Sequence, residues 1–147
     1  MLTRRRAIAR VGAAALCVAG AGAWAQEAGG PAAAAAGAIE TVIASQIDAF
    51  LRDDFEGAFA FASPNIRRVF GSSERFGAMV RQGYPMVWRP RGWRFAELAP
   101  ARGRLRQAVV FEDAGGAVHV ADYYMVETED GWRIDGVTLR PKVGAGA

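Results

Sequence analysis

Asp122 is the carboxylate that stands out among the residues that could do chemistry. It lies in a predicted strand over residues 117–128, among mostly apolar neighbours, beside Tyr124 and diagonal to Gln107 of the preceding strand. A carboxylate among apolar side chains is costly unless it is hydrogen-bonded, and burial raises its pKa toward the range used in acid–base catalysis. Asp122 is therefore the candidate catalytic residue. The alternatives are a polar anchor for a ligand and a structural carboxylate held by donors.

His119 is the only histidine, and the register below predicts it on the opposite face, across from Glu112. There it forms a solvated cross-strand pair, with a general base as the alternative. The only cysteine, Cys17, lies in the N-terminal segment, and no carboxylates cluster with loop spacing, so the ligand sets of zinc and calcium are missing. We expect no metal and no cofactor.

Arginines are concentrated in the middle of the chain. Residues 63–110 hold ten of them against two glutamates, and the rest of the exported chain is acidic. One interpretation is that the two parts pair through surface ion pairs. The other is an anion site, since guanidinium groups suit carboxylates and phosphates and tryptophans can stack on them. The residues of that site would be Arg81, Arg89, Arg91 and Arg94 with Trp88 and Trp93; of these, Trp88, Arg89 and Arg91 join Asp122, Gln107 and Tyr124 as ligand-binding candidates.

The elements that must position these residues form an antiparallel sheet. Residues 104–112, 117–128 and 132–140 alternate apolar and polar side chains, and a strand over 93–98 precedes them. A two-residue turn at Gly115-Gly116 predicts two cross-strand pairs, Val109 with Asp122 and Gln107 with Tyr124. A three-residue loop over 129–131 predicts that Val126 pairs with Ile134 and that Glu127 lies opposite Arg133.

This register gathers one apolar face. Its members are Leu105, Val109, Phe111, Val118, Val120, Tyr124, Val126, Trp132 and Ile134. In the last strand the apolar positions change parity after Ile134, to Val137 and Leu139, with Gly136 between them. Such a change predicts a β-bulge and a curved sheet.

Helices precede the sheet. A stripe of Ile39, Ile43, Ile47 and Phe50 predicts a long amphipathic helix over 39–52. Capping residues predict three further helices, over 55–62, 64–70 and 73–82. The two prolines of residues 84–90 predict an extended segment. Helices followed by a curved antiparallel sheet make an α+β domain whose long helix lies on the concave face.

The N-terminus has the pattern of an export signal. Four arginines precede an apolar run from Val11 to Ala23, and Ala23-Trp24-Ala25 is a small-x-small cleavage site. The run is shorter than the roughly 20 residues of a membrane span, so we expect no permanent membrane anchor. We interpret residues 1–25 as a cleaved signal peptide, of general or twin-arginine type, that directs the protein to the periplasm or medium. Residues 26–38 read as an Ala/Gly-rich linker whose alanines could extend the next helix, 39–140 as one domain, and 141–147 as a flexible tail.

Removal of the signal reverses the sign of the net charge. The chain has 18 Lys and Arg, four of them in the signal, against 15 Asp and Glu, which leaves a net charge of −1. We therefore expect no nucleic-acid partner, which would require a basic domain.

Three segments carry a resemblance to a known family. They are Ala60 to Pro64, Phe76 to Pro90 and Asp130 to Ile134, and the part from Gly83-Tyr84-Pro85 to Trp88-Arg89-Pro90 is the most distinctive. Together they resemble a bacterial family catalogued as domain of unknown function 4864, over roughly residues 39–139. The resemblance implies the cone-shaped fold of nuclear transport factor 2 and ketosteroid isomerase. It implies no catalytic residues.

Three classes of function follow. The first is an exported module that binds a small apolar or anionic ligand, since the chain has an expected pocket but no complete catalytic set. The second is an acid–base enzyme of the isomerase or dehydratase type that uses Asp122, which rests partly on fold analogy. The third is an interaction domain that forms a homodimer through its sheet.

Overall fold

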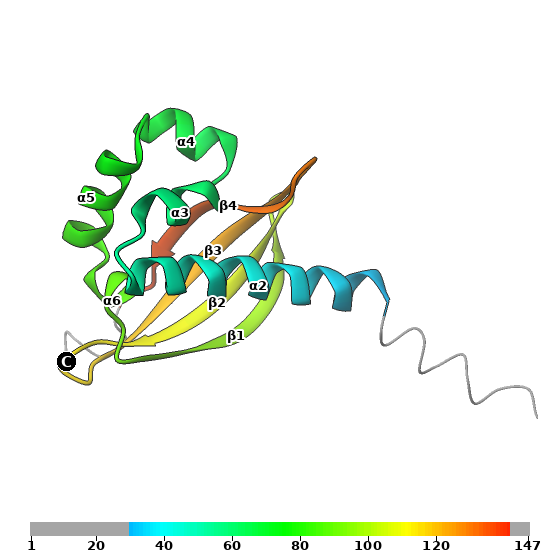
Figure 1. The fold of residues 1–147 in the computed structure, drawn as a ribbon. Coiled ribbons are helices and arrows are strands. Elements are labelled where there is room, and N and C mark those ends of the chain that lie inside the picture. The colour runs from blue at the N-terminus through cyan, green and yellow to red at the C-terminus, as the bar shows by residue number, and fades with distance from the viewer. Residues whose placement is uncertain (1–29, 142–147) are drawn as a thin grey trace, which may run out of the picture.

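The structure is a computed structural model that describes residues 30–141. In the described part of the chain, five helices precede four strands; Figure 1 shows their arrangement. The helices are α2 (Pro31–Leu51), α3 (Phe55–Ala60), α4 (Pro64–Phe70), α5 (Ser73–Gly83) and α6 (Pro85–Trp88). The strands are β1 (Gly92–Ala101), β2 (Arg104–Glu112), β3 (Val118–Thr128) and β4 (Gly131–Leu139). They form one antiparallel sheet in the order β1-β2-β3-β4, which confirms the α+β class. The predicted signal peptide and residues 142–147 lie outside the described residues.

Helix α2 begins eight residues before the predicted residue 39. Residues 31–38, expected as linker, form its first turns, with Pro31 at the first helical position and five alanines after it. Proline fits that position and alanine has the highest helix propensity, so the extension follows from the local sequence. By length and composition alone α2 could cross a membrane. Its face of Ile39, Ile43 and Ile47, however, is buried in the core of the domain.

The segment predicted to be extended, residues 84–90, contains helix α6. Pro85 is the first residue of this single turn, a position where its missing N–H costs nothing. Tyr84 precedes it with φ −134° and ψ 52°, outside the α region that a following proline disfavours. The prediction of an extended segment was therefore wrong at residues 85–88.

The β2–β3 hairpin has a different turn from the predicted one. Asp113 donates its N–H to Ala117 O, which leaves a three-residue loop, and Asp113 Oδ1 accepts from the N–H groups of Gly115 and Ala117. Gly116 has φ 86°, the left-handed conformation that closes such loops. The pairing therefore shifts by one residue, so that Val109 faces Ala121, Ala108 faces Asp122 and Gln107 faces Tyr123.

The β3–β4 hairpin also differs by one residue. Thr128 pairs with Gly131 across a two-residue loop. Thr128 Oγ1 donates to Gly131 O and accepts from Asp130 N, which closes this tighter turn. Val126 consequently pairs with Arg133, and Glu127 with Trp132 instead of Arg133. The predicted bulge near Gly136 is confirmed, because the register shifts between the pair Tyr124–Gly136 and the pair Met125–Ile134.

These shifts change the face that strand β3 contributes. Its buried apolar side chains are Ala121, Tyr123 and Met125, whereas the prediction chose Val118, Val120, Tyr124 and Val126. A shift of one residue exchanges the two faces of a strand, so all four assignments were wrong together. The assignments on β2 and β4 were correct, since Val109, Phe111 and Ile134 are buried in the core.

The helices cover one face of the sheet. Figure 1 shows α2 lying across the sheet; α4 contacts β4, and α5 packs against α3 and α6. In the core, Ile39, Ile43, Ile47 and Phe50 of α2 pack with the buried residues of β2, β3 and β4. Burial of each such side chain contributes about 1.5–3 kcal/mol. The other face, which carries Val118 and Asp122, is not covered by the described helices.

Candidate functional site: an apolar pocket

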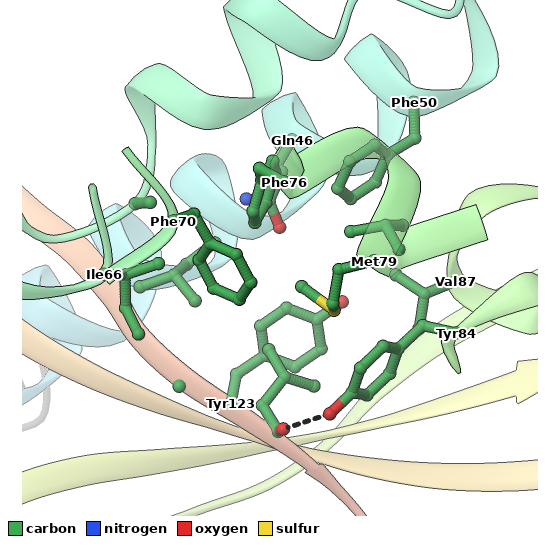
Figure 2. Close-up of a pocket in the computed structure, with 14 residues that line it drawn as sticks. Gln46, Phe50, Ile66, Phe70, Phe76, Met79, Tyr84, Val87 and Tyr123 are labelled. Atoms are coloured by element: carbon green, nitrogen blue, oxygen red, sulfur yellow. Dashed lines mark hydrogen bonds between the residues drawn. The ribbon is translucent and has the colours of Figure 1, made fainter. Parts of the chain in front are cut away.

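A pocket of 380 Å³ lies between the helices and the sheet. It is lined by side chains from the C-terminal part of α2, from α4, α5 and α6, and from β3 and β4 (Figure 2). Most of the lining is apolar, with Phe50, Phe70, Phe76, Met79 and Ile134 among its members. None of the lining residues is charged. The volume falls within the range of about 300–1,000 Å³ that is typical of small-molecule sites.

Helix α4 forms one wall of the pocket and is fixed at its N-terminal end. Ser63, its N-cap, donates its backbone N–H to Ile134 O at 2.8 Å, and its hydroxyl donates to Asp135 Oδ1 at 2.7 Å. The same hydroxyl accepts from Ile66 N at 3.2 Å. No residue of α4 is fully buried, and Ile66 and Phe70 line the pocket. Helix α4 is therefore attached to the domain by its cap and by a few apolar side chains.

Helix α5 forms the opposite wall. Ser72 caps it by accepting from Arg75 N, and Phe76 and Val80 on its buried face line the pocket with Met79. The Phe76 ring packs against the rings of Phe59 and Phe70, with centroid distances of 5.2 and 5.7 Å. Aromatic pairs at this spacing add to the stability gained from burial. This aromatic cluster fixes the wall behind the pocket.

Three lining residues carry polar groups. Gln46 donates from Nε2 to Ala58 O at 3.1 Å. Tyr84 donates its hydroxyl proton to Val137 O at 3.0 Å, the dashed line in Figure 2. Tyr123 is fully buried, and its hydroxyl has no hydrogen-bond partner among the described residues. Tyr123 is therefore the lining residue whose polar atom has no hydrogen-bond partner among the described residues.

The environment of Tyr123 keeps its hydroxyl protonated. Burial raises the pKa of this group well above its ordinary value, and the neighbouring Tyr84 raises it further. A phenol with a raised pKa stays neutral at physiological pH and can donate a hydrogen bond. It is therefore a poor proton acceptor and a stable donor.

Asp122 does not line this pocket. The shifted register places it on the uncovered face of the sheet, where Arg140 binds it through two hydrogen bonds of 2.8 and 2.9 Å. Arg106 Nε lies 3.8 Å from the same carboxylate, and Arg140 also binds the exposed Glu97. Bonds to Asp122 and Glu97 raise the pKa of Arg140 above its ordinary value. The prediction that Asp122 faces the apolar cavity was wrong, and its environment is that of a structural ion pair.

Gln107 and Tyr124, the predicted neighbours of Asp122, also lie outside the pocket lining. Gln107 is buried and donates to Ala96 O and Ala108 O. Its bond to Ala96 lies in the irregularity of β1 between Phe95 and Leu98, where a bulge interrupts the ladder. Tyr124 is packed under the guanidinium of Arg104 at 4.6 Å. Each residue therefore has a structural role that explains its position.

Trp88 and Arg89 form a cap for helix α2. Arg89 donates to Phe50 O at 2.8 Å and to Asp53 Oδ1 at 2.7 Å, and Trp88 Nε1 donates to the same carboxylate. The guanidinium also lies over the Trp88 ring at 4.7 Å. A cation at the C-terminal end of a helix satisfies free carbonyls and the helix dipole.

The remaining arginines of the predicted anion site do not converge. Arg91 forms an exposed ion pair with Glu112 at 3.5 Å, and Arg81 lies over the Phe55 ring at 5.0 Å. Arg94 is exposed on β1. The predicted site therefore has no shared geometry. Pairing between the basic and acidic parts of the chain, the other interpretation, accounts for Arg89 and Arg91.

His119 binds Asp113, and not Glu112 as the predicted register required. Its Nε2 lies 2.7 Å from Asp113 Oδ2, and this bond is the main cause that lowers the pKa of the Asp113 carboxyl. The N–H groups of Ala117 and Gly115 lower the pKa further. Together these bonds fix the tip of the β2–β3 hairpin, so His119 has a structural role there.

Sequence reasoning missed Gln46, Tyr84 and Tyr123 as pocket residues. Asp113 before Ala114-Gly115-Gly116 was the signal for Tyr123, because an aspartate that starts a turn favours the longer loop, which turns Tyr123 inward. Tyr84 lies in the distinctive Gly-Tyr-Pro segment, but that segment was predicted to be extended and to lead into a strand. Gln46 had no signal beyond its place on the buried side of the α2 stripe.

The comparisons with known proteins identify a family without a function. A family described as Domain of unknown function (DUF4864) matches residues 32–147. No curated protein and no solved structure matches the chain. The match contains all of β1 to β4 and the whole pocket lining, together with α2 except its first residue.

Proposed function

We propose that this chain, which belongs to the DUF4864 family, is an exported module that binds a small apolar ligand in the pocket between α4, α5 and the sheet. The observation that carries the proposal is the uncharged apolar lining of a 380 Å³ pocket. When a ligand displaces water from the apolar surface of a concave site of this size, burial of that surface favours binding.

The anionic ligand that the arginines also allowed is not favoured. None of the residues that line the pocket carries a positive charge, and Arg89 and Arg91 are engaged in ion pairs outside it. A buried anion without a cation or several donors has a high desolvation cost. The supported ligand is therefore neutral over most of its surface.

An acid–base enzyme receives less support from the same geometry. The residues that line the pocket include no carboxylate, histidine or lysine, and Asp122 lies on the other face of the sheet. A general base has to reach the proton that it abstracts. A module that binds and releases its ligand unchanged needs no such group.

Export, the cone-shaped fold of nuclear transport factor 2 and a homodimer remain parts of the proposal. Export is supported by the arginine-led apolar run before Gln26. N-terminal sequencing of the protein recovered from the periplasm or medium should return Gln26. A sequence beginning at Met1 would argue against cleavage.

Binding can be tested with N-phenyl-1-naphthylamine, a neutral probe that fluoresces in apolar surroundings. We expect a saturable increase in its fluorescence with the protein. Ile66→Trp should weaken binding about tenfold, because overfilling a packed site costs about 1–3 kcal/mol. Ile66 is half-buried on a peripheral helix and lines the pocket, so the domain should tolerate the larger ring.

The matched control is Val69→Trp, which adds the same ring to the same helix. Val69 is 69% exposed and does not line the pocket, so binding should be unchanged. No saturable binding by the unmodified protein, or the same loss in both variants, would contradict the proposal.

A further inference from the structure

The hydroxyl of Tyr123 indicates the chemistry of a ligand more specifically than the apolar lining around it does. The side chain is fully buried, and its oxygen has no partner among the described residues. Figure 2 shows the ring rising from the sheet into the space bounded by Phe70, Met79 and Tyr84. A buried donor without an acceptor is unfavourable, and native proteins keep few of them. Such a donor at a pocket therefore points to an acceptor that comes with the ligand.

The neighbouring polar groups do not serve as that acceptor. Tyr84 is the nearby residue that raises the pKa of Tyr123, yet its hydroxyl is held by the bond to Val137 O at 3.0 Å. Gln46 is held through Nε2 by Ala58 O at 3.1 Å. Each of the two side chains is held by a bond to the backbone, and neither accepts a hydrogen bond from the Tyr123 hydroxyl.

We propose that the ligand of this pocket is an apolar molecule with one neutral acceptor oxygen, such as a ketone, ester or ether, and that the Tyr123 hydroxyl donates to that oxygen. This inference rests on the proposed function and names the chemical class of its ligand. A carboxylate or phosphate does not fit, because none of the lining residues is a cation. A pure hydrocarbon fills the pocket but leaves the donor unpaired.

The test compares two compounds of nearly the same shape, 2-acetylnaphthalene and 2-ethylnaphthalene, which differ in the ketone oxygen. Affinities for the unmodified protein and for Tyr123→Phe are measured by titration calorimetry. The two compounds differ in hydration, but this difference is the same for both proteins. It therefore cancels when the ratio of the two affinities is compared between the unmodified protein and Tyr123→Phe, as in a double-mutant cycle. We expect the preference for the ketone to fall about tenfold in Tyr123→Phe, the scale of one hydrogen bond in a dry site.

A spectroscopic readout separates a hydrogen bond from a change in packing. The carbonyl stretch of bound 2-acetylnaphthalene should lie at lower frequency in the unmodified protein than in Tyr123→Phe. The control is Tyr124→Phe, the same substitution one residue along, on the uncovered face under Arg104. It should change neither the ratio nor the frequency.

The outcomes distinguish this inference from the proposed function. If N-phenyl-1-naphthylamine binds but Tyr123→Phe leaves the ratio and the carbonyl frequency unchanged, the inference is overturned and the pocket stands. The same holds if the ketone does not bind while the probe does. If none of the three compounds binds, the proposed function fails and the inference fails with it.

Discussion

Asp122 and Tyr123 are neighbours in the chain that point to opposite faces of strand β3. Asp122 satisfies its charge with Arg140 and Arg106, whereas Tyr123 has no partner among the described residues. Structural residues normally have their polar groups paired, and sites of function retain unpaired groups at a cost in stability. The pairing state of each side chain therefore supports a structural role for Asp122 and the binding role proposed for Tyr123.

Removal of the Tyr123 hydroxyl should stabilise the ligand-free protein. Tyr123→Phe keeps the ring and removes an unpaired buried donor, so we expect the free energy of unfolding to rise by about 1 kcal/mol. Tyr84→Phe should lower it by a similar amount, because Tyr84 donates to Val137 O. Urea unfolding of the two variants measures both changes. A loss of stability in Tyr123→Phe would show that this hydroxyl is paired in the native protein.

Loss of the Asp122 charge should affect stability and leave the pocket intact. The Asp122 side chain is 9% exposed between its arginines, so Asp122→Asn should cost about 1–3 kcal/mol of unfolding free energy. Glu97 is the other partner of Arg140, and its side chain is 60% exposed. Glu97→Gln should therefore cost less than about 1 kcal/mol of unfolding free energy. Probe binding should be unchanged in both. Weaker probe binding by folded Asp122→Asn would restore Asp122 as a ligand-binding residue.

The pH dependence of stability should include a term from Asp113. Its bonds to His119 and to the turn lower the pKa of the carboxyl below its ordinary value of 3.8. Between the two pKa values the unfolded chain binds more protons, so stability falls as the pH drops below 3.8 toward the folded pKa and is constant for this group above 3.8. NMR titration of the Asp113 carboxyl measures the shift. His119→Ala should move its pKa back toward 3.8, and an unchanged pKa would contradict this cause.

At the scale of elements, helix α5 approaches α3 so closely that only glycine fits at one position. A Cβ atom on Gly77 would lie 2.8 Å from the ring of Phe55, whereas one on Gly37 in α2 would have no neighbour within 4 Å. Gly77→Ala should therefore destabilise the domain by about 1–3 kcal/mol, the cost of overpacking. Gly37→Ala should stabilise it by about 0.5–1 kcal/mol through helix propensity. Thermal unfolding measures both, and changes of the same sign would refute the close approach.

The elements themselves were predictable, and their register was not. The apolar stripe of Ile39, Ile43 and Ile47 is enough to predict a helix. The alternation of apolar and polar residues on β2 is enough to predict a strand. Register depends on turn length. Asp113 and Gly116 form a three-residue loop where a two-residue turn was predicted, and this difference exchanges the two faces of β3. The predicted site, centred on Asp122, therefore fell on the wrong side of the sheet.

At the scale of the whole molecule, the pocket lies where the chain brings separate segments together. Its walls come from α2, α4, α5 and α6 and its floor from β3 and β4, so no single motif encodes it. On the uncovered face, by contrast, Arg140 forms ion pairs with Asp122 and Glu97. The apolar pocket and these ion pairs therefore lie on opposite faces of the sheet.

The most direct test of the apolar site is a methyl NMR titration of the domain with N-phenyl-1-naphthylamine. We expect shifts of the methyl signals of Ile66, Met79 and Ile134, which line the pocket, and no shifts at Val118 and Val120 on the uncovered face. Shifts confined to Val118 and Val120, or no saturable shift at all, would contradict it.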